Sequence, residues 1–242
     1  MGVHRNGDRV SLFDRLTDCD TSAYRNITSL RVSQDLFDDL VPDAAGRAAA
    51  LAADLRMRSS APGVIERGLH YSQAIDYPFT ADVSVASRYG DGTVRVWYGA
   101  LEELTSLAET CWHALRQIRA IDGVTTPVTR HRAMYRVRAH GLFLELRGKE
   151  AEHPELLDED YAPTQAIAKH SAMQGLPGLL YPSARWPDGS CLAAFRADPL
   201  RDPQLIYYLT YRIDPIQQTV AIARQPGAVE RVFTLSELRR RR

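Results

Sequence analysis

The chain has 242 residues, of which 45% are hydrophobic and 25% charged, a composition typical of a globular protein with one buried core. Its 30 Lys and Arg balance 30 Asp and Glu, so the formal net charge is zero and the pI is about 7.1. No overall positive field therefore draws the chain to nucleic acid or to an anionic membrane.

The first 63 residues are predicted to form an N-terminal helical extension. Residues 33–41 begin at Ser33, a favoured N-cap, and place acidic residues in the first turn of a helix. Residues 44–57 are rich in alanine and predict a second helix, and residues 61–63 (APG) end the helical pattern. The extension contains no group of residues that suggests chemistry. Its role is open between support of the fold, a partner surface and a dimer surface.

A strand and a helix follow in the central part of the chain. Residues 94–100 (VRVWYGA) predict a strand, because aromatic and β-branched residues favour strands. Residues 101–118 predict a helix with one buried face. Its apolar stripe consists of Leu104, Leu107 or Ala108, Cys111, Leu115 and Ile118.

The next segment predicts a β-hairpin. Residues 132–139 alternate between two faces, as the residues of a strand do. His140 and Gly141 are then expected to turn the chain back into residues 142–148.

The remaining elements are one helix and several short strands. Residues 162–174 predict a helix that Gly175 ends. Short buried strands are predicted at 178–185 and 191–197, and further strands at 205–213, 219–224 and 231–235. The arginine-rich tail at 237–242 is expected to be a frayed, solvated helix end and not a nucleic-acid site.

Three polar residues in the central part could meet in one cleft. Residues 90–92 (GDG) permit a tight reversal, so Arg88 is expected at the end of one strand and Tyr98 on the next. Glu109 lies four residues before His113, so both are expected on one helix face. Taken singly, each has a simpler interpretation: a surface arginine, a core tyrosine, and a helix glutamate paired with His113 or Arg116.

Four segments together resemble a known family, the RES domain. They are SRYGDG with Arg88, VWYGA with Tyr98, LAETCWH with Glu109, and GLPGLLYPSARWPDGSCLAAF with Ser183. The resemblance covers roughly residues 64–199, so we expect a RES domain over 64–242 that ends in C-terminal strands from residue 200. One departure is Gly90, where many members carry asparagine or serine two places after the arginine.

The resemblance implies an α+β fold similar to ADP-ribosyltransferases, with a mixed, mainly antiparallel β core, flanking helices and a cleft for NAD. It also implies an enzyme that cleaves the nicotinamide N-glycosidic bond, as an NAD phosphorylase or glycohydrolase, and acts as the toxin of a toxin–antitoxin pair. The alternatives are a mono-ADP-ribosyltransferase and a non-catalytic NAD-binding or ADP-ribose-binding module. The implied partner is an Xre-like antitoxin, and a homodimer is a further expectation.

The resemblance also assigns roles to the site residues. Glu109 would stabilise the positive charge that develops on ribose, and Arg88 would hold phosphate or ribose oxygens. Tyr98 would border the nicotinamide ring. Ser183 would bond ribose or align Glu109. Two further NAD contacts are expected. Arg67 resembles an arginine on the first strand of the fold. His113 could orient Glu109 or simply form a helix pair with it.

Cysteine and histidine usage predicts no metal site. Three cysteines without a CxxC motif and seven histidines without an HExxH motif argue against a zinc site and against a disulfide framework. The N-terminus has no hydrophobic signal core, and no apolar run approaches the length that spans a membrane. We therefore expect a cytoplasmic protein that binds no metal. The resemblance implies that NAD is bound as a substrate.

Overall fold

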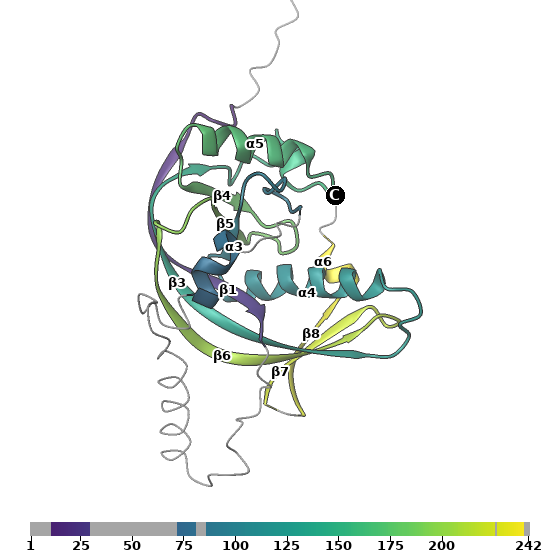
Figure 1. Cartoon of the computed structure of the whole chain (residues 1–242). Coiled ribbons are helices and arrows are strands. Elements are labelled where there is room, and N and C mark those ends of the chain that lie inside the picture. The colour runs from purple at the N-terminus through teal and green to yellow at the C-terminus, as the bar shows by residue number, and fades with distance from the viewer. Residues whose placement is uncertain (1–10, 30–71, 81–85, 226, 240–242) are drawn as a thin grey trace, which may run out of the picture.

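The computed structural model describes residues 11–29, 72–80, 86–225 and 227–239 (Figure 1). The strands are β1 (Leu16–Thr28), β2 (Trp97–Ala100), β3 (Val128–Glu145), β4 (Gly178–Pro182), β5 (Ser190–Ala194), β6 (Leu200–Asp214), β7 (Thr219–Gln225) and β8 (Ala228–Thr234). The helices are α3 (Tyr77–Thr80), which continues a π-helical turn at Ser72–Asp76, α4 (Glu103–Arg119), α5 (Ala162–Met173) and α6 (Leu235–Leu238). A single 3₁₀ turn spans Pro154–Leu156.

The described strands form one mixed sheet with the order β1-β2-β5-β4-β3-β6-β7-β8. All pairings are antiparallel except that of β3 with β4, which is parallel. Because β1 pairs with β3 as well as with β2, the strands β1, β2, β5, β4 and β3 close into a ring. The prediction of an α+β fold with a mixed, mainly antiparallel core is confirmed.

Strand β1 corrects the prediction that residues 1–63 are helical. The described part of that segment, residues 11–29, contains β1, which pairs with β3 along its whole length from Leu16↔Leu144 to Thr28↔Arg132. Most side chains of β1 are polar, so the sequence carries little strand signal, and the long edge of β3 supplies the pairing instead. The predicted helices at 33–41 and 44–57 lie outside the described residues, and the domain boundary at residue 63 stays a prediction.

The predicted hairpin at His140 and Gly141 is also wrong. Strand β3 runs unbroken through both residues, and Gly141 pairs with Cys19 of β1. Gly141 has a φ of 132°, which glycine adopts without strain, so the backbone passes this point without reversing. The two halves of β3 do not fold back on each other because β1 already pairs with both of them.

Helix α4 packs across the curved sheet on the side of β6, β7 and β8 (Figure 1). Its predicted apolar stripe is confirmed, since Leu107, Ala108, Cys111, Leu115 and Ile118 are buried and Leu104 is partly buried against the same core. The same core includes Leu235 and Leu238 of α6, so the described start of the C-terminal tail is a packed helical turn. Burial of one face leaves the opposite polar face of α4 available to line a cleft.

The other predicted elements between residues 94 and 235 are present, with shorter or longer bounds. Strand β2 begins at Trp97, three residues later than predicted, and β6 begins at Leu200, five residues earlier. Helix α5 ends as predicted before Gly175, whose φ of 77° lies in the left-handed region that favours glycine.

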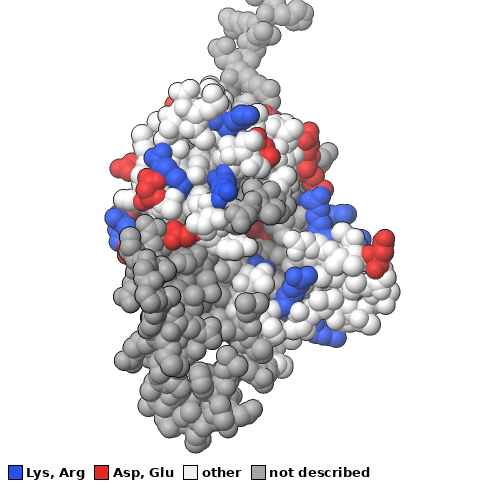
Figure 2. Space-filling model, viewed as in Figure 1, with Lys and Arg blue, Asp and Glu red and all other residues white. Residues whose placement is uncertain are grey.

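Charged side chains of both signs are intermingled on the face of the molecule that Figure 2 shows. This matches the balanced composition of the chain. None of the described helices is long and apolar enough to cross a lipid bilayer.

The start of β4 depends on a close backbone approach at Gly178. A Cβ atom there would lie 2.1 Å from the carbonyl oxygen of Ala193 in β5, so Gly178→Ala must push the two strands apart. We expect a loss of about 3 kcal/mol in the free energy of unfolding, measured by urea denaturation. Gly123→Ala is the control: its Cβ would meet nothing within 4 Å, although its φ of 81° costs about 1 kcal/mol. Equal losses in the two variants would contradict this account.

Candidate active site

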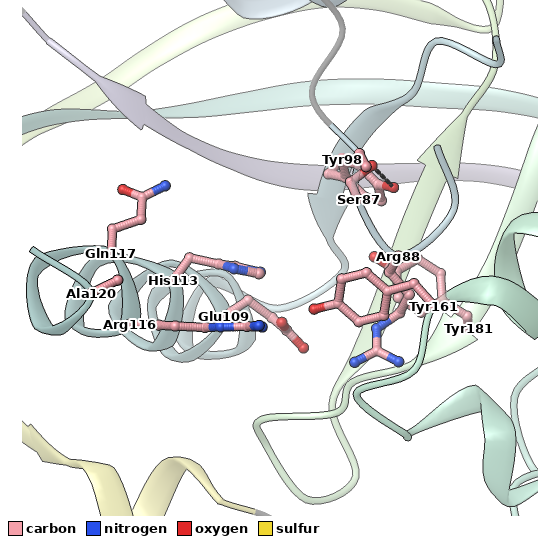
Figure 3. A pocket seen from close by; sticks show the side chains of 11 residues that line it. Ser87, Arg88, Tyr98, Glu109, His113, Arg116, Gln117, Ala120, Tyr161 and Tyr181 are labelled. Carbon is pink, nitrogen blue, oxygen red and sulfur yellow. Dashed lines mark hydrogen bonds between the residues drawn. The ribbon is translucent and has the colours of Figure 1, made fainter. Parts of the chain in front are cut away.

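A cleft of about 490 Å³ opens between the polar face of α4 and the turn that precedes β2. Figure 3 shows the side chains around it. They come from the turn at residues 86–88, from β2, from α4, from the start of α5 and from β4. The lining residues are Ala86, Ser87, Arg88, Tyr98, Glu109, His113, Arg116, Gln117, Ala120, Tyr161 and Tyr181.

The carboxylate of Glu109 is fixed by the turn between β4 and β5. The Ser183 hydroxyl donates to Glu109 Oε1 at 2.6 Å, and the backbone N–H of Ala184 donates to the same oxygen at 3.1 Å. Within the described part of the chain, no hydrogen bond engages Oε2. One carboxylate oxygen is thus anchored, and Figure 3 shows the group pointing from α4 toward Tyr161 and Arg88.

Ser183 is itself held so that its hydroxyl has one possible orientation. The residue is fully buried, and its Oγ accepts from the backbone N–H groups of Arg185 at 3.1 Å and Trp186 at 3.0 Å. With two bonds accepted, the hydroxyl proton is left for Glu109. Ser183 therefore holds the Glu109 carboxylate in place, which fits one of its two predicted roles, while a bond to ribose stays a prediction.

Gly189 brings this turn against the start of α4. Its N–H donates to the carbonyl of Trp186 and its carbonyl accepts from the N–H of Ser183, which closes the turn. A Cβ atom on Gly189 would lie 2.5 Å from the side-chain oxygen of Thr105, in the first turns of α4. The close approach sets the distance between Ser183 and Glu109.

Arg88 lies opposite α4 and is almost fully buried, with 9% of its surface exposed. Its Nη1 donates to the carbonyls of Leu156, at 3.1 Å, and Asp158, at 2.7 Å. Its guanidinium group also packs over the ring of Tyr161, 4.8 Å from the ring centroid. These contacts fix the guanidinium plane. Among the described residues only Nη1 donates a hydrogen bond, which leaves Nη2 and Nε for an anion.

The predicted position of Arg88 at the end of a strand is wrong, because residues 86–96 contain no strand. Arg88 lies inside a tight turn instead, in which the N–H of Ser87 donates to the carbonyl of Gly90 at 2.8 Å. A Cβ atom on Gly90 would lie 2.8 Å from Ser87 Oγ, so a larger residue there would displace the Ser87 side chain.

Tyr98 faces the cleft, but its hydroxyl is already occupied. The hydroxyl bonds Ser87 Oγ at 2.8 Å (Figure 3). It also accepts from the backbone N–H of Tyr89 at 2.9 Å. Burial raises the pKa of Tyr98 to about 12, so the phenol stays protonated at neutral pH. The predicted ring contact to nicotinamide stays a prediction, while the hydroxyl positions the turn that carries Arg88.

His113 and Arg116 continue the polar face of α4 beyond Glu109 (Figure 3). Desolvation lowers the pKa of His113, and the nearby guanidinium charges of Arg185, Arg88 and Arg116 lower it further, against the opposing charge of Glu109. In the described part of the chain, neither His113 nor Arg116 makes a hydrogen bond or ion pair with Glu109. The side chain that bonds Glu109 there is that of Ser183.

Sequence analysis did not identify two aromatic residues that line the cleft. Tyr161 and Tyr181 complete the cleft wall with Tyr98. Tyr181 stands two residues before Ser183 in the motif GLLYPSAR, which is the one signal that could have identified it. Arg67 lies outside the described residues, so its contact with NAD stays a prediction. Among the described residues, no group of three or more His, Cys, Asp or Glu could hold a metal ion.

The bonds of the Tyr98 hydroxyl give a direct test of the turn that carries Arg88. Tyr98→Phe leaves the N–H of Tyr89 without its acceptor, so we expect a loss of about 2 kcal/mol in the free energy of unfolding by urea denaturation. Tyr77→Phe serves as the control, because Tyr77 is 66% exposed and should change stability by less than about 0.5 kcal/mol. A stable Tyr98→Phe protein would show that the turn does not depend on this hydroxyl.

Comparison with known families identifies the chain. Residues 61–214, more than half of the sequence, match the family model of the RES domain. No curated protein matches the chain. The matched range contains Arg88, Tyr98, Glu109 and Ser183, and the chain belongs to the RES domain family.

Proposed function

Because the chain is a RES domain protein whose cleft places Glu109 opposite Arg88, we propose that it is an enzyme that consumes NAD. It cleaves the N-glycosidic bond between nicotinamide and ribose, with water or phosphate as the acceptor. The observation that carries the proposal is the anchored carboxylate of Glu109, held by Ser183 at 2.6 Å beside a cleft of about 490 Å³.

The chemistry of the bond explains the carboxylate. As nicotinamide leaves, the ribose ring takes on positive charge, and a fixed negative group beside it stabilises the transition state more than the ground state. Glu109 offers Oε2 for this purpose while Oε1 is held by Ser183 and the N–H of Ala184. Since the carboxylate is already oriented, little reorganisation is needed when the charge develops.

The opposite wall of the cleft suits the rest of the dinucleotide. Arg88 offers two guanidinium nitrogens to the diphosphate or to ribose oxygens, and its plane is set by Tyr161. Tyr98, Tyr161 and Tyr181 offer aromatic surface to a flat, cationic nicotinamide ring. NAD enters this scheme as the substrate, and the scheme requires no metal.

The biological role that we propose is that of a toxin in a toxin–antitoxin pair. The family match is compatible with such a role, and loss of NAD would account for toxicity. The partner would be an Xre-like antitoxin that covers the cleft mouth near Arg88 or restrains the enzyme from a distance. Growth arrest on expression of the parent chain, relieved by Glu109→Gln, tests this role; growth unaffected by the parent chain counts against it. A homodimer in the cytoplasm stays our expectation.

Variants of the two linked residues test the enzyme. Glu109→Gln should lower the rate of nicotinamide release from NAD by at least about 100-fold, because the amide cannot balance the positive charge on ribose. Ser183→Ala should lower it by about 10- to 100-fold, because the carboxylate remains but loses its orientation. Nicotinamide is measured by chromatography.

Glu230→Gln is the matched control, since Glu230 is an exposed acid of β8 that bonds Arg224 outside the cleft. It should retain the parent rate. The enzyme proposal is abandoned if the parent protein releases no nicotinamide with or without phosphate, or if Glu109→Gln is as active as the parent.

The products of the same reaction identify the acceptor. Free ADP-ribose shows hydrolysis, and ADP-ribose 1″-phosphate formed only when phosphate is present shows phosphorolysis. Label from NAD recovered on protein shows an ADP-ribosyltransferase. NAD binding by calorimetry without any product shows a non-catalytic binding module, which would replace the enzyme proposal.

A further inference from the structure

Arg185 is a buried arginine that the scheme above does not use. Only 4% of its surface is exposed, and its Nε and Nη2 make no hydrogen bond with the described residues. Its guanidinium group packs over the ring of Trp112, 3.8 Å from the ring centroid. A cation enclosed in this way, with two N–H groups unpaired, is costly unless an acceptor reaches it.

Arg185 lies next to the catalytic carboxylate. Its backbone N–H donates to Ser183 Oγ at 3.1 Å, and that hydroxyl donates to Glu109. Trp112, on which the guanidinium packs, is three residues after Glu109 and so lies one turn along α4. Arg185 does not line the cleft, and it is linked to the lining residue Glu109 through Ser183.

One acidic loop contacts both arginines. The carbonyl of Asp158 accepts from Arg88 Nη1, and the carboxylate of Glu159, the next residue, lies 3.6 Å from Arg185 Nη1. The two guanidinium groups therefore flank one short stretch of chain at the edge of the cleft. Glu159 is 56% exposed, and an exposed ion pair at this separation is weak.

The position of Glu159 suggests what Arg185 binds. A carboxylate and a phosphate group are both recognised by the same planar face of a guanidinium group, and a phosphate offers more charge and more acceptor oxygens. A stronger anion can therefore displace Glu159 from Arg185 Nη1. Desolvation lowers the pKa of Arg185, because burial disfavours its charged form.

We propose that Arg185 is a second anion-binding residue of this cleft, which takes a phosphate group together with Arg88, and that Glu159 occupies its place until that group arrives. Within the proposed NAD-consuming function, on which this assignment rests, the group is a phosphate of the dinucleotide. Glu159 then acts as an internal competitor that weakens substrate binding.

Calorimetry with inorganic pyrophosphate tests the assignment without any turnover. Glu159→Gln should tighten pyrophosphate binding about two- to fivefold, because the competing carboxylate is removed. Arg185→Gln should weaken it at least about tenfold, and Arg185→Lys should fall between, because a lysine keeps the charge but not the planar fork.

Asp188→Asn is the matched control. Asp188 is exposed in the same turn as Arg185, its φ of 59° is one that asparagine tolerates, and it contacts neither arginine. It removes the same unit of charge as Glu159→Gln and should leave pyrophosphate affinity within about twofold of the parent.

The assignment is overturned if Glu159→Gln binds pyrophosphate no more tightly than Asp188→Asn. It is also overturned if a folded Arg185→Gln protein binds as the parent does. Should Arg185→Gln fail to fold, the exposed Glu159→Gln variant decides the question alone. Pyrophosphate binding that depends on Arg185, in a protein that releases no nicotinamide, would keep this assignment and remove only the proposed enzyme function.

Discussion

The candidate site depends on one hydrogen bond, from the Ser183 hydroxyl to Glu109, at 2.6 Å. It joins helix α4 to the turn between β4 and β5, and the turn can reach the helix because Gly189 packs against Thr105. Two backbone N–H groups fix the serine oxygen, which leaves its proton to Glu109. A flexible acidic side chain thereby becomes a fixed charge, which is what stabilisation of a developing cation requires.

Arginine and aromatic side chains organise the walls around this charge. Arg88 packs on Tyr161 and Arg185 on Trp112, and elsewhere in the fold Arg132 packs on Tyr211 and Arg224 on Tyr207. A guanidinium group keeps its charge when buried and packs flat against a ring. Arg185 and Arg224 also pair with acidic residues, whereas Arg88 is held by its ring contact and by backbone carbonyls. In the cleft, Arg88 therefore keeps N–H donors for a ligand, which ion pairs with acidic side chains would occupy.

Local patterns account for what could be predicted of the fold. The apolar spacing of α4 and the β-branched and aromatic content of β6, β7 and β8 are signals within single segments, and those elements are present. Strand β1 is mostly polar, so no local signal marked it as a strand of the sheet. Gly141 indicated a turn because glycine permits one, but pairing of β1 with both sides of it keeps β3 extended.

The sequence by itself determined the family and singled out four candidate site residues, because Arg88, Tyr98, Glu109 and Ser183 stand in characteristic short motifs. Only the tertiary structure decided which contacts each one makes. Ser183 and Glu109 are 74 residues apart, and their contact follows from the sheet register and from the packing of Gly189, which no short segment encodes. The same is true of Arg185, because its burial and its unpaired N–H groups exist only once α4, the β4–β5 turn and the acidic loop have come together.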